Sequence, residues 1–175
     1  MTTITLEPVD GDDRDALDTL VSWIRSEKML RQWTDSVFSH PLDTGQLADH
    51  LTDSDVRRQA FAAVDDDGSM VGYLELNRID ETRRSASIAR VVVAPDHRGE
   101  GVATEMLRAV LRIGFEDYDC HRIDLRVFDF NEAAIRCYER VGFTREGTLR
   151  DARRYGDEYW SLVVMSLLED EWTAK

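Results

Sequence analysis

The sequence predicts an α/β domain of the mixed α+β kind, in which a central mixed and twisted sheet of about seven strands is flanked by about four helices. Three observations lead to this prediction. Short runs typical of strands recur along the chain, and between them apolar residues follow helical spacing. The chain has 175 residues, three prolines and no internal repeat. This length is enough for one core that needs neither disulfides nor metal, so we expect a single domain over residues 1–175.

The first part of the chain predicts a strand, two helices and a hairpin. The run ITLEPV near the start alternates as a strand does. Residues 13–28 have helical spacing of apolar side chains, at Leu17, Leu20, Val21 and Ile24. Residues 29–55 predict loop and a short helix. Two strand-like runs, Gln59 to Val64 and Met70 to Asn77, flank the turn sequence DDDGS and predict a hairpin.

The rest of the chain predicts alternation of strands and helices. A strand from Ser85 to Val93 ends before Pro95, because proline cannot donate to a sheet ladder. An amphipathic helix follows over residues 100–115. A strand, a helix and two final strands are then expected over residues 121–128, 131–141, 144–150 and 159–168, with RRYGDE as the last turn. The order β-α-α-β-β-β-α-β-α-β-β places helices on both faces of a mixed sheet.

Charge and cysteine content exclude several classes of protein. The formal net charge of −13 argues against a nucleic-acid partner, because phosphate backbones are bound through clustered Lys and Arg. No apolar run approaches the ~18 residues of a membrane span and the first residues lack a signal-peptide pattern, so we expect a cytoplasmic protein with no membrane partner. Cys120 and Cys137 lie far apart in regular structure, so neither a disulfide nor a metal site is expected.

The acidic composition has an unusual make-up. Lysine occurs only at Lys28 and Lys175 beside 20 arginines, and 22 aspartates outnumber 13 glutamates. This bias indicates a halophile, a chain adapted to high salt, where screening relieves self-repulsion. The competing interpretation is that the acidity attracts a cationic substrate.

The segment ARVVVAPDHRGEGVATEMLRAVL, residues 89–111, changes abruptly from a β-branched strand through a glycine-spaced turn into an amphipathic helix. The first turn of a helix carries unpartnered backbone N–H groups and partial positive charge, so it binds anions such as phosphate. Gly99 and Gly101 permit unusual backbone angles and close approach of a ligand, and Arg98 adds a positive charge. The segment therefore predicts a phosphate-binding turn, although the glycines alone also fit a tight strand-to-helix connection.

This turn differs from two common phosphate motifs. GEGVAT gives G-x-G-x-x-T rather than the G-x-G-x-x-G of a dinucleotide site, and the Gly-Lys-Ser/Thr of a P-loop is missing. RGEGVA instead resembles the [Gln/Arg]-x-x-Gly-x-[Gly/Ala] signature of the GNAT N-acetyltransferase superfamily. Arg98, Gly101 and Ala103 stand at the matching positions.

Two later segments strengthen the resemblance. NEAAIRCYERVGF resembles the next segment of the family, in which Asn131 opens a helix, Tyr138 follows seven residues later and Gly-Phe leads into a strand. REGTLRDARRYGDEYWSLVVMSLLEDEW resembles the C-terminal hairpin of the branch that contains ribosomal-protein N-terminal alanine acetyltransferases and spermidine acetyltransferases. The resemblance is close over residues 85–172.

The resemblance implies acetyl-CoA as the cosubstrate and no metal. In this family the strand before the phosphate turn splays from its parallel neighbour, and the pantetheine arm lies in the gap. Backbone groups near Val91 and Val93 would pair with that arm, and an N–H near Val93 would face the thioester oxygen. The residues expected to bind the cofactor are Val91, Val93, Arg98, Gly99, Gly101, Val102, Ala103, Thr104 and Asn131.

The implied reaction moves the acetyl group of acetyl-CoA to a primary amine that attacks directly in a ternary complex. Tyr138 stands where the family keeps its general acid, and a phenol can protonate a departing thiolate. The base is harder to assign, because related enzymes often have a glutamate where this sequence has Ser87. Glu75 on the adjacent strand is the best substitute, ahead of Asp129 and Glu158, and a water relay is equally consistent.

The acceptor and the assembly stay open at this level. A small-molecule amine or a protein N-terminus would fit as acceptor, and related enzymes are often homodimers. Trp33 and Phe38 could line an acceptor pocket or anchor a loop, and His40 could touch the substrate. Asn131 and Tyr138 also fit structural roles, as a helix cap and a core aromatic.

Two other function classes remain as alternatives. One is a catalytically silent GNAT-like module that binds CoA as a sensor or partner subunit, which the missing strand carboxylate favours. The other is a redox enzyme that binds NAD or NADP, whose sequence motif is absent.

Overall fold

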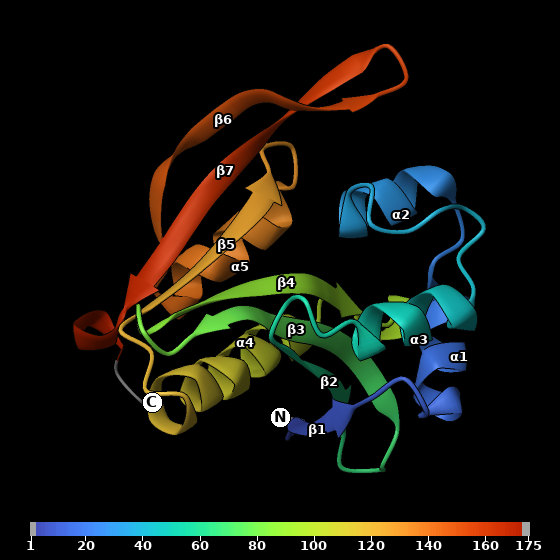
Figure 1. Cartoon of the computed structure of the whole chain (residues 1–175), viewed down its shortest axis with the longest axis horizontal. Coiled ribbons are helices and arrows are strands. Elements are labelled where there is room, and N and C mark those ends of the chain that lie inside the picture. The colour runs from blue at the N-terminus through green and yellow to red at the C-terminus, as the bar shows by residue number, and fades with distance from the viewer. Residues whose placement is uncertain (1–2, 173–175) are drawn as a thin grey trace.

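Seven strands form one sheet in the order β1-β2-β3-β4-β5-β7-β6 (Figure 1). The computed structural model describes residues 3–172. Neighbouring strands are antiparallel except β4 and β5, which are parallel, so the sheet is mixed as predicted. The strands are β1 (Thr5–Val9), β2 (Arg58–Val64), β3 (Met70–Asp80), β4 (Ser85–Val93), β5 (Arg122–Phe128), β6 (Thr144–Tyr155) and β7 (Glu158–Leu168).

The described residues contain five α-helices, one more than predicted. They are α1 (Arg14–Trp23), α2 (Glu27–Thr34), α3 (Thr44–Thr52), α4 (Val102–Arg112) and α5 (Glu132–Val141). The helix predicted over residues 13–28 ends earlier because Ser26 begins a new one, where its hydroxyl accepts the Met29 N–H at 3.1 Å. Asp43 caps α3 similarly by accepting the Gln46 N–H at 2.9 Å.

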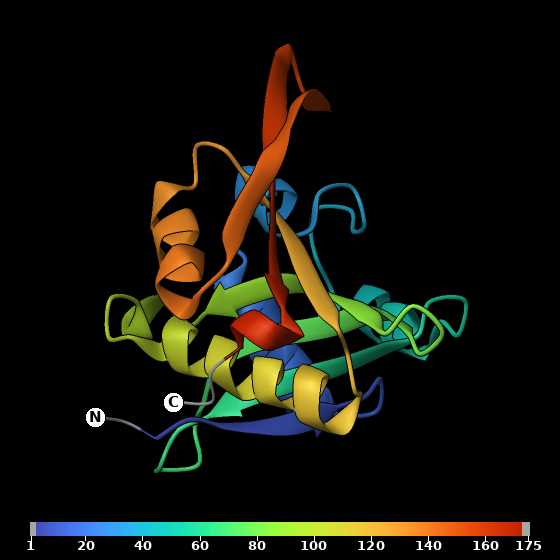
Figure 2. The ribbon, with the colours of Figure 1, turned by 90° about the vertical axis from the view of Figure 1, so that its left-hand side faces the viewer.

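Helices cover both faces of the sheet, and each face has its own core. Because side chains alternate along a strand, Phe61 and Leu74 pack in the core on the α4 and α5 side, whereas Ala62 and Tyr73 pack with α1, α2 and α3. Figure 2 shows α4 crossing one face of the sheet. Burial on both faces fixes the register of β2, β3 and β4, the strands that position the site.

The parallel pair β4 and β5 separates along its length. Residues 85–87 of β4 pair with residues 122–124 of β5, and beyond them the two strands diverge (Figure 1). All of β5 stays paired with β7. The splay implied by the family resemblance is therefore present, and it leaves one side of β4 unpaired from Ile88 onward.

The last two strands form a longer hairpin than predicted. β6 continues to Tyr155 instead of ending at Arg150, and two turn residues, Gly156 and Asp157, connect it to β7. Most of β6 is exposed, so its side chains do not alternate between core and solvent in a way that sequence patterning could detect. The hairpin extends beyond the body of the molecule (Figure 2).

No helix within residues 3–172 is long and apolar enough to cross a membrane. Cys120 and Cys137 are free thiols and are buried.

Candidate active site

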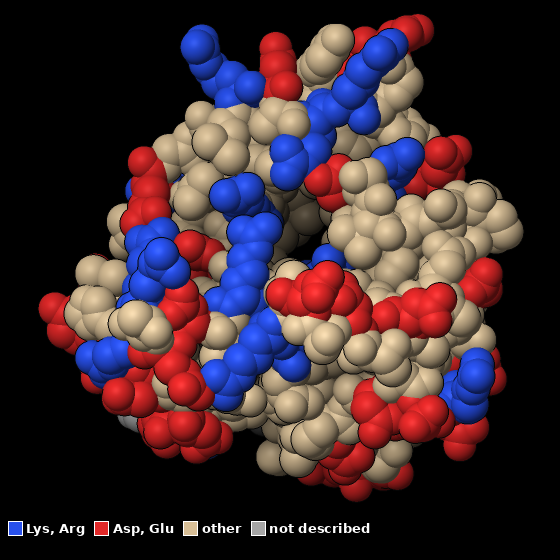
Figure 3. Space-filling model, in the orientation of Figure 1, with Lys and Arg blue, Asp and Glu red and all other residues tan. Residues whose placement is uncertain are grey.

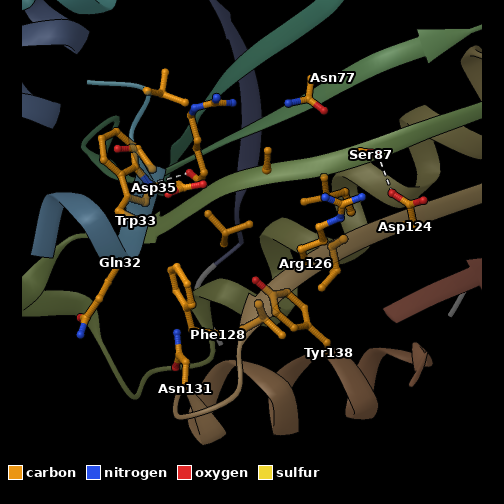
Figure 4. Close-up of a pocket in the computed structure, with 18 of the residues that line it drawn as sticks. Gln32, Trp33, Asp35, Asn77, Ser87, Asp124, Arg126, Phe128, Asn131 and Tyr138 are labelled. Carbon is orange, nitrogen blue, oxygen red and sulfur yellow. Dashed lines mark hydrogen bonds between the residues drawn. The ribbon is translucent and has the colours of Figure 1, made fainter. Parts of the chain in front are cut away.

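A cleft of about 300 Å³ lies where β4 and β5 separate (Figure 4). Its walls come from α2 and the loop after it, from β3, β4 and β5, from α5 and its N-cap residue, and from β6. Figure 3 shows the corresponding hollow between the α2 side of the molecule and the strands opposite. The cleft therefore joins segments that are far apart in the sequence, and several of the predicted site residues lie in it.

Arg90 shapes the β4 wall of the cleft. Its φ of 53° lies in the left-handed region, which arginine rarely adopts, and the β3–β4 register shifts opposite it. Two contacts hold this bulge: Arg90 Nη1 donates to Glu75 Oε2 at 2.8 Å, and the Arg90 carbonyl accepts the Trp33 indole N–H at 2.9 Å. Helix α2 and strand β3 thus both fix the backbone next to Val91.

Glu75 lies behind this wall and is completely buried. Its carboxylate also contacts His50 Nε2 at 3.0 and 3.1 Å and accepts the Tyr73 hydroxyl at 2.8 Å. Burial raises the pKa of Glu75, but the His50 hydrogen bond and the Arg90 charge outweigh it, so the pKa is lowered. Glu75 is not among the cleft-lining residues. The base role predicted for it remains a prediction, and this geometry favours an orienting role instead.

Tyr138 lies on α5 and lines the cleft. Its ring packs edge-on against Phe143 with centroids 5.9 Å apart, so it is part of the core. Its hydroxyl points into the cleft (Figure 4). Burial raises the pKa of Tyr138, so the phenol stays protonated around neutral pH. Tyr138 is therefore a core residue whose hydroxyl faces the cleft, and its role as general acid stays a prediction.

Asn131 both caps a helix and lines the cleft. Its side-chain oxygen caps α5 by accepting the Ala134 N–H at 3.3 Å, and the residue lines the cleft beside Phe128. Capping uses the amide oxygen, so the amide nitrogen can still donate to a ligand.

The turn before α4 presents unpartnered donors. Within residues 3–172 the backbone N–H groups of residues 98–101 meet no hydrogen-bond acceptor. Gly99 and Gly101 have φ of 82° and 86°, and a Cβ on either would meet nothing within 4 Å. Glycine is therefore required here by backbone conformation and not by packing, and the open space beside it suits a phosphate at a helix N-terminus.

The other residues predicted to bind the cofactor differ in their burial and in which of their groups are free to contact a ligand. Val91 lines the cleft, whereas Val93 lies beyond it and its carbonyl accepts Arg98 Nε at 3.3 Å. Val102 is buried, so only its backbone is available. The Thr104 hydroxyl lies 3.5 Å from Cys137 Sγ. The backbone N–H of Thr104 donates to the Gly101 carbonyl at 3.0 Å.

Ala103 belongs to the same first turn of α4 as Val102 and is partly buried against the core. Its side chain is apolar, so the backbone N–H is the group that it offers to an anion.

Of the three residues expected near the acceptor, only one lines the cleft. Trp33 lines the cleft, Phe38 is buried in the core below it, and His40 is exposed and not among the lining residues. An ion pair between Arg153 on β6 and Asp35 after α2 joins the two sides. These two residues were not anticipated, because 118 residues separate them and no local pattern marks the contact.

Sequence reasoning also missed the arginines of the cleft. Arg78 on β3 and Arg126 on β5 are exposed and line it with Arg90 and Arg153. The alternation of Arg122, Asp124 and Arg126 along β5 could have marked a polar strand face, but nothing in it identified a site.

Comparison with known proteins agrees with this geometry. The model of the acetyltransferase (GNAT) family matches residues 20–143. The chain is similar to the spermidine N(1)-acetyltransferase of Escherichia coli (strain K12), with 25% identity over 98% of this chain and 89% of that protein. It is 27% identical to the putative ribosomal N-acetyltransferase YdaF of Bacillus subtilis (strain 168), over 97% of this chain and 93% of that protein.

Solved structures give the same fold. The crystal structure of spermidine N-acetyltransferase from Vibrio cholerae in complex with CoA and spermine superimposes with a TM-score of 0.82, at 24% identity and over 97% of both chains.

Proposed function

The chain belongs to the acetyltransferase (GNAT) family, and from this membership we propose how its cleft moves the acetyl group of acetyl-CoA to a primary amine. Amine and thioester meet in a ternary complex where β4 and β5 separate. The observation that carries the proposal is the position of the Tyr138 hydroxyl, which points into the same cleft that the β4 backbone lines.

The residues present suit acetyl-CoA, which when bound supplies an activated acetyl thioester. The unpartnered N–H groups of residues 98–101 and the first turn of α4 would hold its phosphates, assisted by Arg98. Backbone groups near Val91 would hold the arm along the unpaired side of β4, and the Asn131 amide nitrogen would add a donor at the start of α5.

Tyr138 acts in this proposal as the general acid that protonates the departing sulfur. Its raised pKa keeps the proton available. The attacking amine must first lose a proton, which costs about 4 kcal/mol near neutral pH for a pKa of about 10.4. Because Glu75 is saturated with hydrogen bonds and sits behind the wall, we assign it to hold Arg90, and we assign deprotonation to water in the cleft.

The proposal also includes the class of acceptor. Similarity to spermidine N(1)-acetyltransferase and to a putative ribosomal N-acetyltransferase supports an amine on a small molecule or at a protein N-terminus.

The first experiment is titration of acetyl-CoA into wild-type and Gly101→Trp protein. The matched control is Gly68→Trp, because Gly68 has φ of 81° and equally open space in the β2–β3 turn, away from the cleft. We expect wild type and Gly68→Trp to bind and Gly101→Trp to lose binding. Equal binding by both variants would place the cofactor elsewhere.

Release of free thiol in the presence of an amine then separates an enzyme from a module that only binds CoA. Steady release that requires the amine supports transfer. Binding without release under any amine would instead support the silent module.

A further inference from the structure

The carboxylates that line the cleft are already engaged. Asp35 pairs with Arg153. Asp124 accepts the Ser87 hydroxyl at 2.6 Å and lies 3.3 Å from Arg122 Nη2. Within residues 3–172 these two are the only acidic residues among those lining the cleft. A cationic acceptor would therefore have to displace an existing partner to gain a counter-ion.

Two of the lining arginines lack a partner. Arg90 is paired with Glu75 and Arg153 with Asp35, whereas Arg78 and Arg126 make no ion pair or side-chain hydrogen bond within residues 3–172. The cleft thus holds four arginines against two aspartates in a chain whose net charge is −13. Figure 3 shows a column of basic side chains beside the hollow.

The backbone conformation at Arg78 affects the direction of its side chain. Arg78 has φ of 51°, in the left-handed region, at an irregularity between Asn77 and Asp80 in the β3–β4 register. A bulge of this kind re-aims a side chain, and strained backbone concentrates at functional sites. Arg126 reaches the same cleft from β5 (Figure 4). Two strands on either side of β4 therefore supply unpaired guanidinium groups to one cavity.

We infer that the acceptor is a primary amine that carries an anionic group of its own, and that Arg78 and Arg126 bind that group. Guanidinium groups bind carboxylates and phosphates through charge-assisted hydrogen bonds, and the walls of a cleft strengthen such attraction. This inference rests on the proposed acetyl transfer and specifies its substrate class. It runs against a polyamine acceptor, because a polyamine carries only positive charge.

The test compares acceptors that each carry at least one primary amine and differ in charge. Peptides that begin Ala-Asp-Glu and Ala-Lys-Lys, free glutamate and spermidine are assayed by thiol release, and binding of each to protein saturated with CoA is measured by titration. We expect the acidic peptide or glutamate to have the highest kcat/KM, and the stronger of those two identifies a peptide or a small-molecule source.

Arg78→Gln and Arg126→Gln variants link this preference to the two arginines. Both residues are exposed, so the variants should fold. Each should lower kcat/KM for the acidic acceptor about 10-fold or more, with little change for the basic peptide. Arg112→Gln removes the same charge from an exposed position on α4 that does not line the cleft and should change neither.

Two results would overturn the inference and leave the transfer reaction standing. One is that acetyl-CoA binds and spermidine or the basic peptide is the better acceptor, in turnover or in binding. The other is an acidic preference that the arginine variants retain. Loss of acetyl-CoA binding in wild type would instead refute the proposed function itself.

Discussion

Arg90 is the residue on which the geometry of the cleft depends most directly. A left-handed backbone costs a non-glycine residue about 1–3 kcal/mol, so surrounding contacts must maintain it. The ion pair with Glu75 and the indole hydrogen bond from Trp33 are those contacts. Because Val91 follows immediately, a relaxed Arg90 would turn the backbone groups that are proposed to face the cofactor.

Replacing Glu75 by Gln tests this support. Removing one partner of a buried ion pair should lower the free energy of unfolding by about 3 kcal/mol or more at pH 7. The control is Glu81→Gln, which removes the exposed partner of Arg57 and should cost less than about 1 kcal/mol. Urea unfolding measures both. Equal effects would mean that the Glu75 pair does not hold the bulge.

The same variant has a predictable pH dependence. The pKa of Glu75 is lowered in the folded protein from its ordinary 4.5, so its stabilisation is complete above pH 4.5 and is lost as the pH falls through the folded value. The stability difference between wild type and Glu75→Gln should therefore shrink below about pH 4.5. A gap that stays constant in acid would show that the charge is not responsible.

Tyr138→Phe tests the proton donor. The ring keeps its contact with Phe143, so folding should be unaffected, while kcat should fall about 100-fold or more with acetyl-CoA binding unchanged. Tyr118→Phe, on the turn after α4, should retain wild-type kcat. Because burial raises the Tyr138 pKa above 10, wild type should not lose activity through this group below about pH 10. Unchanged kcat in Tyr138→Phe would assign protonation to solvent.

Among the elements, those with strong local signals were predictable. β4 has the predicted bounds because a β-branched run stops before Pro95, and α5 begins after the predicted cap Asn131. The caps Ser26 and Asp43 were overlooked because the stretch around them is polar and lacks a long apolar period.

The same distinction applies to the site. Gly101 and Tyr138 belong to contiguous motifs and could be named from the sequence. Arg78, Arg90 and Arg126 enter the cleft through bulges and strand pairing, which depend on tertiary register and leave no trace in residue spacing.

The β6–β7 hairpin and α2 are tied together by Arg153 and Asp35, and Arg153→Ala tests what this tie does. Both side chains are about one-third exposed, so stability should change by less than about 1 kcal/mol. The freed hairpin should raise the acceptor KM a few-fold, leave acetyl-CoA binding intact and speed proteolysis at Gly156. Arg150→Ala on the same strand is the control, because the exposed Arg150 side chain makes no ion pair or hydrogen bond within residues 3–172. If Arg153→Ala changed neither the acceptor KM nor the rate of proteolysis, the ion pair would not be what holds the hairpin against α2.

For the whole molecule, the distribution of charge matters more than its sum. The net charge is −13, yet the cleft collects arginines and its two aspartates are engaged. The acidity therefore lies mainly outside the cleft, which weakens the interpretation that it attracts a cationic substrate. High-salt adaptation is the remaining explanation, and it stays a prediction, as do a cytoplasmic location and a homodimer.

Thermal unfolding at different salt concentrations tests that explanation. Raising NaCl from about 0.1 M to about 1 M shortens the Debye length from about 10 Å to about 3 Å, which screens repulsion among the excess carboxylates. Screening also weakens surface ion pairs, but each contributes only about 0–1 kcal/mol, so relief of repulsion should dominate and Tm should rise. A variant with Asp66→Lys and Asp67→Lys in the exposed β2–β3 turn carries four fewer net negative charges and should gain less from salt. A Tm that falls with NaCl would mean that ion pairs outweigh repulsion, and the acidic composition would then need a cause other than habitat.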